Sequence, residues 1–265
     1  MGEMRKCGDE KFARSEALLG SEAMVRFKAA RVLVVGVGGV GSWCAEALVR
    51  TGVGHITLVD DDVVAESNVN RQCPATAKTI GRPKVEAMAE RLKEINPVCE
   101  VEARNSRFSS AASVPSFSSF SLVVDAIDSI DCKAELILGA TETGVPLVSS
   151  MGAALRLDPT KVKVTRFEKV EGDGLARALR QRFKKLGRFP KGMFSCVWST
   201  ETPVGRSVPD RRNPLETNDS FECDCGALRI TRPTEGKGSL MQVTAVFGMC
   251  LASEAIRILT KGETK

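Results

Sequence analysis

Hydrophobic and polar positions in the first 150 residues alternate between two kinds of segment. Continuous apolar runs such as 31–36 (RVLVVG) are typical of strands buried on both faces, whereas segments such as 82–96 (RPKVEAMAERLKEIN) carry the helical period. Strands are predicted at 31–36, 55–60, 99–103, 121–128 and 145–150, and helices at 20–30, 43–52, 82–96 and 132–144. This alternation predicts an α/β protein with a doubly wound, mostly parallel sheet.

The pattern changes after residue 160. The segment 161–170 alternates like an amphipathic strand, and residues 187–237 hold scattered prolines and charges with little periodicity, which predicts a long loop. The chain closes with a mostly apolar helix at 239–259, which polar residues interrupt, so no membrane span is predicted. We therefore expect a sheet-forming part, 1–160, and a C-terminal part, 161–265, integrated into one domain.

A glycine-rich turn joins the first predicted strand to the next predicted helix. Its glycines are Gly36, Gly38, Gly39 and Gly41. Glycine lets a backbone turn sharply and approach a phosphate closely, and the amino end of the following helix attracts anions. The turn therefore predicts a nucleotide site in a Rossmann-like domain, with a tight turn that binds nothing as the alternative.

An acidic run ends the second predicted strand. Asp60 lies nineteen residues after Gly41, which suits a carboxylate that hydrogen-bonds ribose hydroxyls. The neighbouring Asp61 and Asp62 argue against a 2′-phosphate and therefore against NADP. These features alone do not distinguish NAD from ATP.

Further charged residues favour ATP. Asn68 and Arg71 follow the second strand, and Lys84 opens a helix, where a cation is unfavourable unless an anion binds nearby. Asp128 follows a central strand at the edge where α/β sheets bind ligands, and a carboxylate beside a triphosphate is a natural Mg²⁺ ligand. Together these residues suit a reaction that displaces pyrophosphate. Taken singly, each could be a surface charge, a solvated helix residue or a helix cap.

Composition limits the chemistry. The chain of 265 residues has no Tyr and one His, His55, which excludes dehydrogenases with a Tyr–Lys relay and disfavours Ser-His-Asp hydrolases and multi-His metal sites. His55 begins the second strand, away from the nucleotide, and is interpreted as structural. Nine scattered Cys without a CxxC pair, and no apolar leader, favour free thiols and a cytoplasmic location.

Positive charge concentrates in the C-terminal part. The net charge is +5, and residues 174–191 contain seven basic residues and no acidic one. This segment is either a solvated helix face or a surface for a polyanion such as RNA. Its candidate contacts are Arg177, Arg180, Arg182, Lys184, Lys185 and Arg188.

The motifs together resemble the superfamily of ubiquitin-activating-like enzymes, which adenylate carboxylates. They are GVGGVGS (36–42), LVDDD (58–62), NVNRQ (68–72), GRPKVE (81–86) and DAIDS (125–129). Within the superfamily the sequence is most similar to the branch that acts on threonylcarbamoyladenosine in tRNA. Segments such as 123–137 (VVDAIDSIDCKAELI) and 195–201 (SCVWSTE) carry that similarity.

The resemblance implies an ATP- and Mg²⁺-dependent enzyme that cyclises threonylcarbamoyladenosine in tRNA to a hydantoin. It assigns the nucleotide to Gly36, Gly38, Gly39, Gly41, Asp60, Asp62, Asn68, Arg71, Lys84 and Asp128, the last also holding Mg²⁺. It gives Arg71, Lys84, Asp128 and Arg14 catalytic roles. Arg14 matches a position that reaches into the neighbour's site in superfamily dimers, which implies a homodimer. A sulfur-transfer protein is a further candidate partner.

Three other functions remain open at this point. They are an adenylating enzyme for a ubiquitin-like or sulfur-carrier protein, an NAD-binding oxidoreductase, and a non-catalytic tRNA- or protein-binding module. The paired CxxC zinc ligands typical of the sulfur-carrier branch are absent from the sequence. Some relatives carry a Cys before the last helix that this chain lacks, so either Cys196, Cys223 or Cys225 replaces it or no thiol is required.

Overall fold

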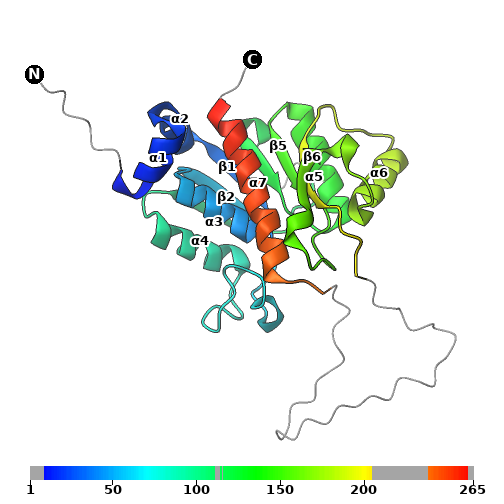
Figure 1. Ribbon diagram of the computed structural model, residues 1–265, viewed down its shortest axis with the longest axis horizontal. Coiled ribbons are helices and arrows are strands. Elements are labelled where there is room, and N and C mark those ends of the chain that lie inside the picture. The colour runs from blue at the N-terminus through cyan, green and yellow to red at the C-terminus, as the bar shows by residue number, and fades with distance from the viewer. Residues whose placement is uncertain (1–8, 111–113, 115, 205–237, 262–265) are drawn as a thin grey trace, which may run out of the picture.

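A seven-stranded sheet with helices on both faces forms the centre of the protein (Figure 1). This computed structural model describes residues 9–110, 114, 116–204 and 238–261. The strands are β1 (Arg31–Val35), β2 (His55–Asp60), β3 (Glu100–Asn105), β4 (Leu122–Asp125), β5 (Leu147–Ser150), β6 (Val162–Arg166) and β7 (Ser195–Ser199). Their order is β3-β2-β1-β4-β5-β7-β6, and only the pairing of β6 with β7 is antiparallel among the described strands. The predicted doubly wound, mostly parallel sheet is confirmed.

The helices divide between the two faces of the sheet (Figure 1). One face carries α2 (Ser21–Ala29), α3 (Gly41–Thr51), α4 (Lys84–Ile95) and α7 (Met241–Lys261), with α1 (Ala13–Leu19) packed on α2. The other carries α5 (Ile130–Thr143) and α6 (Gly174–Leu186). Short 3-10 turns lie at Glu10–Phe12, Glu66–Asn68, Phe117–Ser119, Pro159–Lys161 and Phe167–Lys169.

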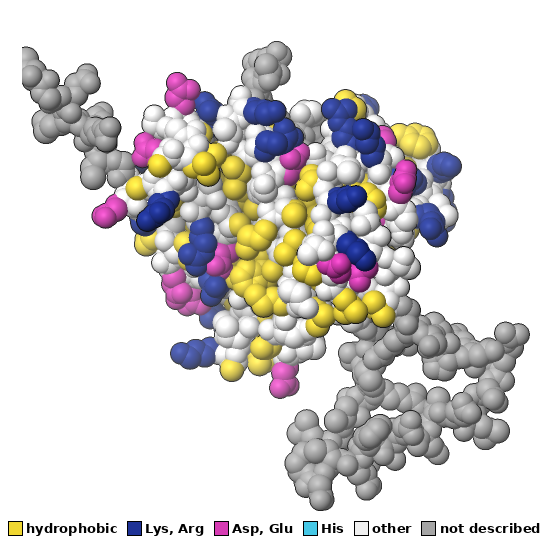
Figure 2. All heavy atoms as spheres, viewed as in Figure 1, with side chains coloured by type: hydrophobic (Ala, Val, Ile, Leu, Met, Phe, Trp, Pro, Cys, Tyr) yellow, Lys and Arg dark blue, Asp and Glu magenta, His cyan; other side chains and the backbone are white. Residues whose placement is uncertain are grey.

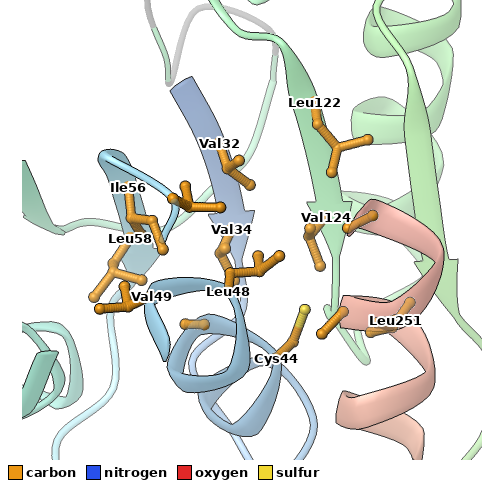
Figure 3. Packing of buried hydrophobic residues seen from close by; sticks show 14 of the residues in the cluster. Val32, Val34, Cys44, Leu48, Val49, Ile56, Leu58, Leu122, Val124 and Leu251 are labelled. Atoms are coloured by element: carbon orange, nitrogen blue, oxygen red, sulfur yellow. The ribbon is translucent and has the colours of Figure 1, made fainter. Parts of the chain in front are cut away.

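Burial on both faces explains the continuous apolar runs of the strands. Val32 and Val34 of β1 point toward α3 and α7, where Leu48 and Leu251 pack in the same cluster (Figure 3). The intervening Leu33 belongs to the second cluster, on the α5 and α6 face. Burial of each such side chain contributes about 1.5–3 kcal/mol to the free energy of folding. The buried centre of the sheet therefore supports the loops at its edge.

The C-terminal part adds to the same sheet instead of forming a separate one. The prediction of a loop over 187–237 is wrong at Ser195–Ser199, because β7 lies there between β5 and β6. The apolar run of β7, residues 196–198, is only three residues long, and pairing with two neighbouring strands supplies its stability. Residues 205–237 of that predicted loop lie outside the described residues. The strand predicted over 161–170 ends earlier, at Arg166.

Helix α7 is a core helix that crosses the front of the molecule in Figure 1. Its length and composition would also allow it to span a membrane, but here Phe247 and Leu251 are fully buried in the core cluster. It approaches α3 closely at Gly248, where an added methyl group would lie 2.6 Å from the carbonyl oxygen of Val40. This contact brings the start of α7 beside the glycine-rich turn.

Candidate nucleotide-binding site

The glycine-rich turn folds tightly between β1 and α3. Gly36 has a φ of +91°, and a methyl group there would lie 2.6 Å from the carbonyl oxygen of Ala126. A methyl group at Gly41 would lie 1.9 Å from the carbonyl oxygen of Gly36, so neither position accepts a side chain without a shift of the backbone. The hydroxyl of Ser42 donates to the carbonyl of Gly38 at 2.6 Å. The turn therefore places backbone directly before the amino end of α3, where anions bind favourably.

Asp60 ends β2 and supports this turn. Its carboxylate accepts hydrogen bonds from the backbone N–H of Val37, at 2.7 Å, and of Asp62, at 2.9 Å. Burial raises the pKa of Asp60 above its ordinary value, and the nearby charge of Lys84 opposes that shift. The carboxylate is thus fixed at the carboxyl edge of the sheet, where α/β folds bind ribose.

Lys84 begins α4 and is almost fully buried. Its ammonium donates to the carboxylate of Asp62 at 2.5 Å. This ion pair offsets the unfavourable placement of a cation at a helix start, so a bound phosphate is not needed to explain that placement. Because Asp62 belongs to the acidic run 60–62, this contact also places the ammonium of Lys84 close to the glycine turn.

The segment after β2 brings Arg71 to the turn. Asn68 accepts a hydrogen bond from the N–H of Ala65 at 3.0 Å, which shapes the segment. The Arg71 guanidinium donates to the carbonyl of Ser67 and the side chain of Asn70, both at 2.9 Å. A methyl group at Gly39 would lie 3.3 Å from Cγ of Arg71, so the aliphatic stem of this side chain passes beside Gly39, while its guanidinium is directed to Ser67 and Asn70.

The turn after β4 forms the opposite wall of the site. Asp125 is fully buried, and its carboxylate pairs with the fully buried ammonium of Lys133 at 2.8 Å. It also accepts from the Ser149 hydroxyl at 2.6 Å and from the Ile127 N–H at 3.1 Å. Asp128, three residues on, is exposed. Among the described residues, the acidic side chains that group within 4.8 Å are those of Asp60, Asp61 and Asp62, without Asp128.

Arg14 does not join the other predicted residues. It lies on α1, which packs on α2 at the far left of Figure 1. The neighbouring Phe12 would be 3.6 Å from a methyl group at Gly52, the residue that ends α3. That end of α3 is opposite to the glycine turn, so Arg14 lies away from the site of its own chain.

Comparison with known proteins assigns the family. The ThiF family profile matches residues 12–265. The chain belongs to the ThiF family. It is 38% identical over 259 residues to a tRNA threonylcarbamoyladenosine dehydratase of Escherichia coli, covering 94% of this chain and 92% of that protein. A Bacillus subtilis protein of the same name is 42% identical over 195 residues, 73% of this chain and 76% of its own.

A crystal structure of the E. coli dehydratase TcdA in complex with ATP is also similar. It superposes with a TM-score of 0.78 at 37% identity and covers 95% of this chain and 94% of that one. The similarity thus extends over nearly the whole fold.

Two residues at the site of this ThiF-family chain are absent from the sequence-based set. Gln72 is buried beside Gly38, and its Oε1 has no hydrogen-bond partner among the described residues. Thr244 of α7 would lie 3.3 Å from a methyl group at Gly39. Gln72 could have been found from its position directly after Arg71. Thr244 gives a weaker signal, as one of several polar residues within an apolar helix.

Residues 174–186 of the basic segment form α6, and the basic side chains of the segment divide into two groups. Arg180 donates to the carbonyls of Phe167 and Val170, Arg182 pairs with Asp131 and Arg188 pairs with Glu135. Arg177, Lys184 and Lys185 are exposed. Figure 2 shows Lys and Arg side chains at the right-hand side of this face, where α6 lies.

Cys196 and His55 lie apart from the site chemistry. Cys196 is fully buried in β7, and burial raises its pKa well above the ordinary value, which makes it a poor nucleophile. Cys223 and Cys225 lie outside the described residues. His55 begins β2 and pairs with Glu100 at 3.0 Å, at the sheet edge opposite to the glycine turn.

Proposed function

We propose that the protein is an ATP-dependent tRNA threonylcarbamoyladenosine dehydratase. The observation that carries this proposal is the convergence of the glycine turn, Asp60, Arg71 and Lys84 at one sheet edge. It occurs in a chain 38% identical to an E. coli dehydratase over 94% of its length. The sulfur-carrier-activating alternative has less support, because the sequence lacks paired CxxC motifs.

The proposed reaction has two steps. An oxygen of the threonyl carboxylate attacks the α-phosphorus of ATP and releases pyrophosphate, which leaves an acyl adenylate. A urea nitrogen of the same nucleoside then attacks the acyl carbon, expels AMP and closes the hydantoin ring, so the nucleoside loses the atoms of one water. Both steps depend on positioned cations and backbone N–H groups more than on a histidine base.

We assign phosphate binding, ribose binding and charge stabilisation to different residues according to their positions. In the proposal the turn 36–41 approaches the phosphates with its backbone, and Asp60 binds the ribose. The stem of Arg71 already lies beside Gly39, and in the proposal its guanidinium turns from Ser67 and Asn70 to contact the phosphates. Lys84 leaves its pairing with Asp62, or shares it, to stabilise negative charge on the phosphates.

Asp128 is the proposed Mg²⁺ ligand. Its exposed carboxylate follows the buried turn at the carboxyl edge, and Mg²⁺ is typically held by one or two carboxylates, substrate phosphates and water. When bound, the ion would neutralise charge on the triphosphate. Asp128 therefore fits the donor chemistry of the ion, with the nucleotide supplying further oxygens.

We also propose that two copies of the chain assemble. Arg14 lies away from its own site, so a role for it at a nucleotide requires a neighbouring copy. The same helical hairpin exposes large hydrophobic side chains, with Leu18 at 83% and Val25 at 70% exposure. Hydrophobic side chains also gather along α7 in Figure 2. The proposed homodimer would cover such surfaces and complete each site.

The proposed tRNA contact lies on α6. Arg177, Lys184 and Lys185 carry it, because they are exposed, whereas the guanidinium of Arg180 is held by two carbonyls and stacks 5.0 Å from the ring of Phe167. Such basic rows bind phosphate backbones without base contacts. The proposal places the enzyme in the cytoplasm, and a sulfur-transfer protein stays a candidate partner.

Mass spectrometry of tRNA nucleosides tests the function. Threonylcarbamoyladenosine in tRNA should lose one water when the protein, ATP and Mg²⁺ are all present, and should be unchanged when any one is omitted. The variant Arg71→Ala is the matched control and should reduce the conversion by about 100-fold. Release of pyrophosphate on addition of a small carrier protein, without loss of water from the nucleoside, would reject the proposal in favour of carrier activation.

A further inference from the structure

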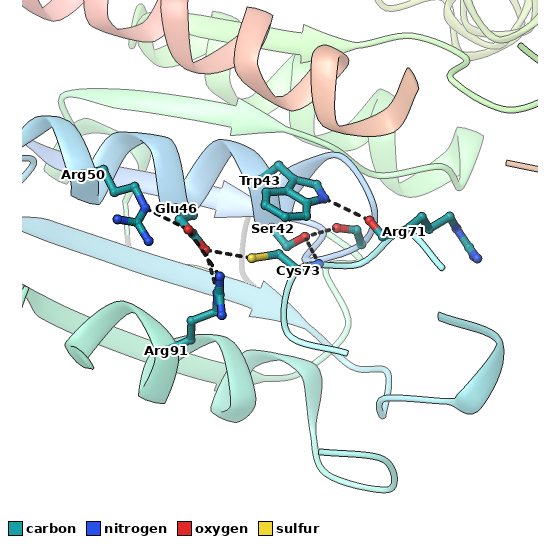
Figure 4. Close-up of polar contacts among 8 residues, drawn as sticks. Ser42, Trp43, Glu46, Arg50, Arg71, Cys73 and Arg91 are labelled. Atoms are coloured by element: carbon teal, nitrogen blue, oxygen red, sulfur yellow. Dashed lines mark hydrogen bonds and ion pairs between the residues drawn. The ribbon is translucent and has the colours of Figure 1, made fainter. Parts of the chain in front are cut away.

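A buried carboxylate lies in α3, one turn beyond the glycine-rich turn. Glu46 is only 5% exposed, yet three hydrogen-bond donors converge on it (Figure 4). Arg91 of α4 donates from Nε at 2.6 Å, Arg50 of α3 from Nε at 2.8 Å, and the thiol of Cys73 at 2.8 Å. Glu46 therefore joins α3, α4 and the segment that leads from β2 to α4.

The contacts of that segment continue from Glu46 to the nucleotide site (Figure 4). The backbone N–H of Cys73 donates to the hydroxyl of Ser42 at 3.2 Å, and the same hydroxyl donates to the carbonyl of Gly38. The indole of Trp43 donates to the carbonyl of Arg71 at 3.0 Å. Residues 71–73 are thus held against the first turns of α3 by their backbone and by the thiol.

The hydrogen bonds to Glu46 stabilise its negative charge. Burial by itself would raise its pKa, but the hydrogen bonds from Arg91, Cys73 and Arg50 outweigh burial and lower the pKa to about 2. The hydrogen bond with Glu46 in turn raises the pKa of Arg91. Glu46 is therefore an anion at neutral pH. An apolar side chain could fill the same space but could not hold two arginines and a thiol in fixed directions.

We propose that Glu46 is a positioning residue for nucleotide binding, which fixes residues 71–73 on α3 and so holds the aliphatic stem of Arg71 beside Gly39, from where its guanidinium can turn to phosphates bound at the glycine turn. The proposal rests on the role proposed above for Arg71 at the phosphates. Glu46 does not contact the glycine turn directly. It acts on Arg71 through its hydrogen bond with Cys73 and through the packing of α4 on α3.

Titration calorimetry with ATP and with adenosine separates positioning from simple loss of structure. In Glu46→Gln the Kd for ATP should rise about tenfold, because Arg71 loses its fixed position. The Kd for adenosine should stay within about twofold, because adenosine has no phosphates for Arg71 to contact. An equal loss of affinity for both ligands would mean a general structural role and would overturn the proposal.

The double variant tests whether Glu46 acts through Arg71. Once Arg71→Ala has weakened ATP binding, adding Glu46→Gln should cause no further loss, whereas additive losses would overturn the proposal. Unchanged ATP affinity in Arg71→Ala would overturn it as well. A chain that shows the predicted coupling but leaves tRNA unchanged would reject the dehydratase function and keep the positioning role.

A milder variant covers the case in which Glu46→Gln does not fold. Cys73→Ala removes only the thiol contact and leaves Glu46 with both arginines, so it should raise the Kd for ATP about threefold with adenosine unchanged. The matched control is Cys99→Ala. Cys99 is another buried thiol, but it donates to the carbonyl of Val53 near the far end of α3. An equal effect of the two cysteine variants on ATP affinity would contradict the proposal.

Discussion

Two buried carboxylates support the two walls of the candidate site in different ways. Asp125 and its partner Lys133 are both fully buried, and they hold the short turn that follows β4. Glu46 is almost as deeply buried, but the side chains of its partners Arg50 and Arg91 are 57% and 39% exposed. One carboxylate is neutralised inside the core, and the other through arginines that reach the solvent.

The difference predicts different consequences of breaking each pair. Removal of Lys133 leaves a charge in the core with no access to water, which is expensive in folding free energy. Removal of one arginine from Glu46 leaves a second arginine and a thiol in place. The Asp125 pair should therefore dominate stability, and the Glu46 network should act mainly on the geometry of the segment 68–73.

Among these variants, Lys133→Met should destabilise the fold most. The free energy of unfolding, measured by urea denaturation at neutral pH, should fall by about 3–5 kcal/mol, because Asp125 loses its buried counter-charge. The double variant Asp125→Asn with Lys133→Met removes both charges and should recover part of this loss. A loss below about 1 kcal/mol in the single variant would show that the pair is not the main support of the turn.

The second prediction concerns acid stability. The folded-state pKa of Glu46, about 2, lies below its ordinary value of 4.5, so the unfolded chain takes up a proton first as the pH falls. The stabilisation from Glu46 is fully present above pH 4.5 and is lost as the pH falls toward 2. Relative to Glu46→Gln, the wild-type chain should lose roughly 2 kcal/mol over that interval.

Denaturation of both proteins at several pH values measures this difference and cancels the carboxyl groups that the two share. Glu254 and Glu102 also have lowered pKa values, whereas burial raises the pKa of Asp60, so the slope of a single protein would mix opposite contributions. Parallel curves for the two proteins would refute the assignment of an acid-sensitive contact to Glu46.

The sequence predicts the parts of the site that local pattern determines. The five strands predicted in the first 150 residues, the glycine turn and the position of Asp60 at the end of β2 follow from periodicity and spacing and are found in the structure, although the strand predicted over 121–128 ends three residues early, at Asp125. The partner of Lys84 was not predicted, although Asp62 was already among the candidate residues. The position of Lys84 at the start of a helix suggested a bound phosphate, and the structure pairs its ammonium with the carboxylate of Asp62.

The supporting network was not predictable, because its members are distant in the chain. Glu46 and Arg91 are 45 residues apart, and each looks in isolation like an ordinary polar position on a helix. The same holds for β7, which is stabilised by pairing with β5 and β6 and not by a strong local pattern. Pairing partners far apart in the chain determine these features, and a single sequence does not reveal them.

Arg50→Ala should be the mildest of these variants, and it tests whether solvent access separates the two carboxylates. Arg50→Ala removes a donor that lies one helical turn from Glu46 and is more than half exposed, so the free energy of unfolding should fall by less than about 1 kcal/mol. Arg91→Ala removes the ion pair that joins α4 to Glu46 of α3 and should cost more under the same urea denaturation. If Arg50→Ala instead cost as much as Lys133→Met, solvent access would not distinguish the two carboxylates. Both carboxylates would then act mainly on stability, and the assignment of stability to the Asp125 pair and of positioning to the Glu46 network would be wrong.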